Sequence, residues 1–193
     1  MGQLTYQLPS LVEYNRQGWQ TTCSSAAVVT SLLAAVATGL LSAVNDVVND
    51  GDFKQKANPH VLDFLYVGSF GAIILNASAT VTSLFLIDEL GDLPTLASDL
   101  DKPKDGFAPD NTDILVYYGL GNTWTWTRWH WIISLVLGAW CLFLQVIVFV
   151  YVTQTTSVKV VVTIFSVLPM YRLMPNLFKR NNTVYPGDSP KYP

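Results

Sequence analysis

Amide and hydroxyl side chains occur inside long apolar segments of this chain, where they could bind ions or join helices through hydrogen bonds. Asn76 lies near the middle of the charge-free stretch 64–87, and Gln145 and Thr38 lie at a similar depth in two other apolar segments. An unpaired amide is costly in hydrocarbon, so we expect Asn76 to be buried and hydrogen-bonded to another helix. These polar groups either hold a helical bundle together or line a path for cations or small solutes.

Two acids mark one end of the apolar segments. Asp46 and Asp63 fall at the same predicted membrane surface, and as the rim of a pore their charge would favour cations. The two histidines, His60 and His130, are expected on opposite surfaces, so they cannot share a metal ion. No Ser-His-Asp order, zinc-protease motif or glycine-rich phosphate loop is present. The sequence therefore predicts no catalytic residue, no metal site, no cofactor and no enzyme.

The composition is that of a membrane protein. Half of the 193 residues are hydrophobic and 13% are charged, whereas a soluble domain carries about 25% charged residues. The net charge of -3 argues against nucleic-acid binding, which normally needs a basic face. We expect an all-α fold, a single integral membrane domain (1–193) built as a four-helix bundle. The four predicted spans, each long enough to cross ~30 Å of hydrocarbon, are about 24–48, 62–87, 131–152 and 157–178.

Small residues recur at every fourth position of the first predicted span. The row consists of Ala27, Ser31, Ala35, Gly39 and Ala43. Such small-xxx-small rows let two helix backbones approach closely in a membrane. The partner is either another helix of the same chain or a second subunit.

The segments outside the predicted spans have distinct compositions. We expect residues 1–22 to form an N-terminal tail or an interfacial helix, and residues 179–193 a C-terminal tail. Residues 88–113 hold eight of the fourteen acids and predict a long solvated loop. The connection to the third predicted span ends in an aromatic cluster, which is expected at the headgroup level of the membrane or, alternatively, as a ligand platform. Its tryptophans are Trp124, Trp126, Trp129 and Trp131.

The distribution of basic residues predicts the orientation. With four spans, both termini and the long loop share one side, which carries eight of the eleven Lys and Arg residues. Because basic residues accumulate on the cytoplasmic side, we expect both termini to be cytoplasmic.

The stretch Leu75–Asp88, LNASATVTSLFLID, resembles uncharacterised four-span membrane proteins predicted in mushroom-forming fungi. The resemblance covers the second predicted span and the start of the loop after it. It implies four membrane spans, and it carries no function.

The sequence favours a structural or organisational membrane protein that self-associates through small-residue helix faces. An oligomeric channel for cations or small solutes is the alternative, based on the polar stripes at matching depth. A lipid- or sterol-binding membrane protein is the third hypothesis, based on the aromatic cluster. The expected partners are membrane lipids and further copies of the chain, forming a homo-oligomer.

Overall fold

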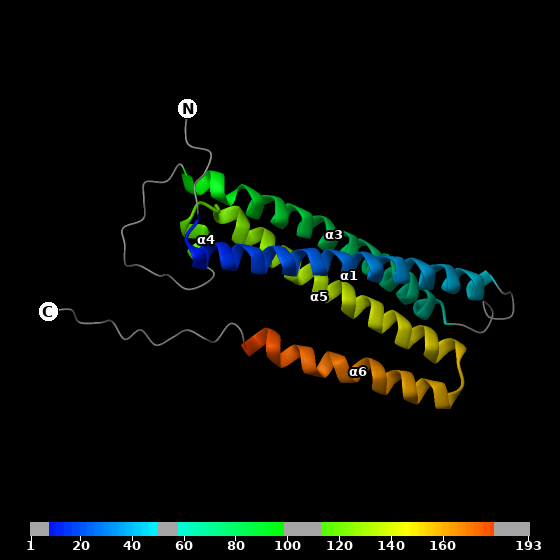
Figure 1. Cartoon of the computed structure of the whole chain (residues 1–193). Coiled ribbons are helices and arrows are strands. Elements are labelled where there is room, and N and C mark those ends of the chain that lie inside the picture. Colours follow the sequence, from blue (N-terminus) through cyan, green and yellow to red (C-terminus); the bar gives the residue numbers. More distant parts are fainter. Residues whose placement is uncertain (1–7, 50–57, 99–112, 180–193) are drawn as a thin grey trace. The chain divides into compact units, whose positions relative to one another are not determined.

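The chain folds into helices, as expected. A computed structural model describes residues 8–49, 58–98 and 113–179, and within these ranges every regular element is a helix. The helices are α1 (Ser10–Asn49), α3 (Pro59–Ser98), α4 (Asp113–Tyr117), α5 (Asn122–Thr153) and α6 (Thr156–Lys179) (Figure 1). By length and composition, α1, α3 and α5 are able to cross a membrane. Among the residues described in full, the apolar part of α6 is Thr156–Leu168, which is shorter than these three helices.

The chain divides into two compact units, and the single membrane domain stays a prediction. The first unit comprises residues Met1–Gln145 and holds α1, α3, α4 and most of α5. The second unit comprises Val146–Pro193, with the end of α5 and all of α6.

Within the first unit, α1 and α3 run antiparallel (Figure 1). Thr30 Oγ1 lies 2.7 Å from Thr80 Oγ1, and Tyr66 Oη donates to Asn45 Oδ1 at 2.9 Å near the other end of the pair. The buried face of α1 repeats at every seventh residue: Cys23, Thr30, Ala37 and Val44. The buried face of α3 alternates steps of four and three: Leu65, Ser69, Ala72, Asn76, Ala79, Ser83, Leu86, Leu90, Leu93 and Ala97. Both faces follow the 3.5-residue period of left-handed, coiled-coil-like packing.

The helices are longer than the predicted spans. At ~1.5 Å per residue, the 40 residues of α1 and of α3 each extend ~60 Å, about twice the ~30 Å of hydrocarbon. The expected N-terminal tail or interfacial helix is instead continuous with α1 from Ser10 onward. The side chains of Leu8, Val12 and Trp19 pack in one hydrophobic cluster with residues of α3, α4 and α5, which explains why the helix begins so early.

The predicted acidic loop is also partly helical. Residues 88–98 continue α3, because Leu90, Leu93 and Ala97 extend its buried face beyond the acids Asp88 and Glu89. Pro94 lies inside this last part of α3, four residues before its end at Ser98. Because proline has no N–H, one backbone hydrogen bond of the helix is missing there. The part of the predicted loop from 99 to 112 lies outside the described residues.

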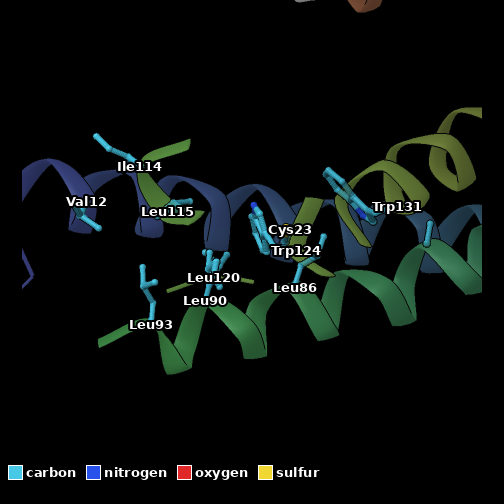
Figure 2. Close-up of a cluster of buried hydrophobic side chains, with 11 residues drawn as sticks. Val12, Cys23, Leu86, Leu90, Leu93, Ile114, Leu115, Leu120, Trp124 and Trp131 are labelled. Atoms are coloured by element: carbon cyan, nitrogen blue, oxygen red, sulfur yellow. The ribbon is translucent and has the colours of Figure 1, made fainter. Parts of the chain in front are cut away.

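These extensions form a small hydrophobic core at one end of the first unit, here called the cap (residues 10–22, 88–98 and 113–130). Figure 2 shows Leu90 and Leu93 of α3, Leu115 of α4 and Trp124 of α5 gathered beside α1. A glycine turn joins α4 to α5: Gly119 has φ 113°, and the N–H of Leu120 donates to the carbonyl of Leu115 at 3.2 Å. This is a Schellman motif, in which a glycine adopts the left-handed conformation that ends the helix.

In the second unit, the end of α5 contacts the start of α6. Thr163 Oγ1 donates to Tyr151 Oη at 3.3 Å, and Lys159 Nζ lies 5.9 Å from the centre of the Tyr151 ring. The first half of α6 exposes apolar side chains on several sides: Val158, Val160, Val161, Ile164, Phe165, Val167 and Leu168. A helix that is apolar nearly all round is suited to a lipid environment.

Candidate functional site: the polar seam between α3 and α5

The first unit buries polar side chains and exposes apolar ones. Thr30, Asn76 and Gln145 are all buried, as are Ser69 and Ser83. The exposed surface of α3 between its ends is apolar and includes Phe64, Val67, Phe70, Ile74, Val81, Leu84 and Phe85. An apolar outer surface over buried polar groups is unusual in soluble proteins, and it fits helices whose outer surface faces lipid.

Most of the buried polar groups lie where α3 meets α5, at a contact here called the seam (Ser69, Asn76 and Ser83 of α3; Trp131, Gly138 and Gln145 of α5). Gln145 Nε2 donates to Ser69 Oγ at 2.6 Å, and Trp131 Nε1 donates to Ser83 Oγ at 2.7 Å. Between these two layers, Asn76 faces Gly138. Successive layers are one heptad apart on both helices, so α3 and α5 are antiparallel and in register.

Asn76 is fully buried against α5, with 0% exposure. A Cβ added to Gly138 would lie 2.9, 3.0 and 3.1 Å from the Nδ2, Cγ and Oδ1 atoms of Asn76, so the amide lies flat against this glycine. Its Nδ2 donates to the carbonyl of Ala72 in its own helix at 2.7 Å, instead of to the expected partner on another helix. The reason is that Gly138 presents no side chain that could accept the bond.

The other two residues expected at this depth lie elsewhere. Gln145 is one heptad away from Asn76 along the seam, where it contacts Ser69. Thr38 is exposed and its hydroxyl donates to Ala34 of its own helix, so it does not reach Asn76. Thr30 is the buried threonine of α1 instead, and it contacts Thr80 of α3. Thr30 lies seven residues from both Cys23 and Ala37, and this spacing was the sequence signal that could have identified Thr30 as the buried threonine.

The two acids of the predicted rim are exposed. Asp46 and Asp63 lie near the ends of α1 and α3 that the Tyr66–Asn45 hydrogen bond joins. Among the described residues, no group of three or more His, Cys, Asp or Glu side chains could hold a metal ion. The ring nitrogen Nε2 of His130 lies 3.1 Å from Ser78 Oγ, which adds a second kind of polar contact between α5 and α3.

The small-residue row of α1 is largely exposed. Ser31, Ala35 and Gly39 are exposed, and Ala27 and Ala43 are partly buried. A Cβ added to Gly39 would meet no atom within 4 Å. The small-residue row is therefore not the face of α1 that packs against α3. That face consists of Cys23, Thr30, Ala37 and Val44.

The four tryptophans expected at the headgroup level divide into two pairs. Trp124 and Trp131 are buried, because they stand seven residues apart on the face of α5 that packs inward. The Trp124 ring lies 5.9 Å from that of Trp19 at a nearly perpendicular angle. Trp126 and Trp129 are 77% and 42% exposed. The register of the seam places Trp126 opposite Asp88, where the charge-free stretch of α3 ends; the interfacial role of this exposed pair stays a prediction.

The cap contains one carboxylate in an unfavourable place. Glu89 Oε2 is buried, and no side chain or backbone group in the described residues bonds to it. Burial raises the pKa of Glu89, and the neighbouring charge of Asp88 raises it further. A raised pKa in the folded state means that stability is lost as the pH rises from the ordinary pKa through the raised one.

We therefore expect Glu89→Gln to stabilise the protein at neutral pH, by about 1 kcal/mol or less because the group is only partly buried. The gain should shrink when unfolding is measured at about pH 4, where the carboxyl group of the original protein is largely protonated. Thermal unfolding in detergent at both pH values measures this. Asp92→Asn, which removes an exposed acid from the same end of α3, is the control and should change little. An equal shift at both pH values would refute the explanation by ionisation.

No family model matches the chain, and comparisons with curated proteins and with solved structures find no significant match. The resemblance to four-span fungal proteins therefore stays a prediction.

Proposed function

We propose that the protein is an integral membrane protein with a structural or organisational role, and that it self-associates through the small-residue row of α1. The observation that carries the proposal is the exposure of Ser31, Ala35 and Gly39 on a helix whose other face already packs against α3. A row of small residues gains nothing from contact with lipid, but it lets a second helix approach closely.

The two faces of α1 differ in their period, which supports two different partners. The face against α3 repeats every seven residues and suits a left-handed crossing. The exposed row repeats every four residues and suits the right-handed crossing of about -40° that small-xxx-small rows favour. Copies inserted with the same orientation would bring α1 against α1 in parallel, crossing near Ala35.

The proposed membrane arrangement uses α6 as a fourth span. Its 24 residues extend ~36 Å, enough to cross ~30 Å of hydrocarbon. An even number of spans places both termini and the cap on one side, and the basic residues favour the cytoplasm for that side.

Cysteine cross-linking in native membranes tests the proposed interface. We expect Ser31→Cys, Ala35→Cys and Gly39→Cys to form disulfide-linked dimers under mild oxidation. Val29→Cys, exposed on another side of α1, should not. The unsubstituted protein gives the background from Cys23 and Cys141, which are buried and partly buried. Equal cross-linking at position 29 and along the row, or none at any position, would refute the interface.

A channel through the seam receives less support. The contacts Gln145–Ser69, Asn76–Gly138 and Trp131–Ser83 bring α3 and α5 directly together at three successive levels. Two of these three contacts are hydrogen bonds between the helices, so they join α3 to α5 and do not line a path.

A further inference from the structure

Two amide oxygens in the interior of the first unit have no protein partner. Asn76 Oδ1 and Gln145 Oε1 are buried, and within the described part of the chain no donor lies within hydrogen-bond distance of either atom. The side chains are 0% and 1% exposed. A buried polar atom left unpaired typically costs about 1–3 kcal/mol, so each oxygen calls for a donor.

The hydrogen-bond geometry fixes which amide atom is the oxygen. Asn76 Nδ2 lies 2.7 Å from the Ala72 carbonyl, which only a donor can satisfy. The hydroxyl group of Ser69 donates to the Leu65 carbonyl at 2.7 Å, so the Ser69 oxygen accepts a hydrogen bond from Gln145 Nε2. Exchanging nitrogen and oxygen in either amide would break these bonds. The unpaired atoms are therefore acceptors.

Several neighbouring donors are already in use. The hydroxyl of Ser83 donates to the Ala79 carbonyl, and the indole N–H of Trp131 donates to Ser83 Oγ. Thr30 and Thr80 have two hydroxyl protons for four contacts, three of them to backbone carbonyls and one to each other. These groups therefore have no proton left for the two amide oxygens.

We propose that the seam binds two water molecules, one donating to Asn76 Oδ1 and one to Gln145 Oε1. Water is the small donor that commonly satisfies such buried groups. A metal cation fits less well, because Na⁺ or Ca²⁺ needs several oxygen ligands at one point. The two oxygens belong to layers one heptad apart, roughly 10 Å at ~1.5 Å per residue, so they form two separate sites.

The test is water-edited solid-state NMR on the isotope-labelled full chain in lipid bilayers. We expect magnetisation transfer from water to the Asn76 and Gly138 signals and to the Gln145 side chain. Leu86, equally buried in α3 but surrounded by apolar groups, should receive none. This measurement on the unsubstituted protein shows whether the seam is hydrated, so the result does not depend on whether any variant folds.

The variants then separate the two sites. Asn76→Leu should abolish the transfer to Gly138 and preserve that to Gln145, and Gln145→Leu should do the converse. A seam as dry as Leu86 would overturn the proposal. So would amide signals that receive no water magnetisation but shift when Na⁺ is exchanged for K⁺, since a cation would then be the ligand.

Discussion

Gly138→Ala is expected to lower the free energy of unfolding by about 1–3 kcal/mol, the cost of inserting a methyl group into a packed interior. The added Cβ would lie within 3.1 Å of three atoms of the Asn76 amide. That amide cannot simply turn away, because its Nδ2 is held by the Ala72 carbonyl at 2.7 Å. The helices must separate, or the buried hydrogen bond must break.

Gly71→Ala is the matched control. It also adds one methyl group between α3 and α5, but the nearest atom, Cys141 Sγ, would be 3.7 Å away, an ordinary contact. Both substitutions gain about 1 kcal/mol of helix propensity, so the difference between them isolates the clash. Thermal or denaturant unfolding in one detergent measures this difference.

A second substitution identifies Asn76 as the obstacle. Adding Asn76→Ala to Gly138→Ala should recover part of the lost stability, because it removes the amide that the new methyl group meets. Similar effects of Gly138→Ala and Gly71→Ala, or no recovery in the double variant, would show that the two helices are not packed as described.

The sequence predicted the helical class and the position of most apolar segments, because runs of apolar residues are local signals. It failed at the helix ends. Counting acids suggested a loop after Asp88, yet Leu90, Leu93 and Ala97 keep the spacing of the buried face and continue α3 to Ser98. Charged residues after an apolar run do not by themselves end a helix, so the spacing of the buried residues was a better guide than the composition.

The polar site was also predicted only in part. Asn76 and Gln145 were correctly singled out as polar residues inside apolar segments, and both are buried. Their partners depend on the register between helices, which no local pattern contains. Thr38 and Thr30 are chemically identical, and only the sevenfold repeat of the buried face of α1 separates the exposed one from the buried one. Gly138 stands seven residues from both Trp131 and Gln145, so its place on the inner face of α5 is visible in the sequence, but its contact with Asn76 depends on the backbone approach of the two helices.

Gly39→Leu is expected to weaken self-association at least about tenfold, which corresponds to about 1.4 kcal/mol, while leaving the fold of the monomer unchanged. The monomer should tolerate the change because a Cβ at Gly39 would meet no atom within 4 Å. A second copy packed on the row would be pushed away by the larger side chain, because close approach of the two backbones requires small residues.

Val29→Leu is the control, since it enlarges an exposed apolar side chain on another side of α1. Single-molecule photobleaching or mass measurement in lipid nanodiscs gives the subunit count, and thermal unfolding checks the monomer. If the original protein is already monomeric, or if Gly39→Leu and Val29→Leu behave alike, self-association through the row is wrong. If Gly39→Leu instead lowers the thermal stability of the monomer, the row packs against another helix of the same chain. That helix is the second partner that the spacing of the small residues allows.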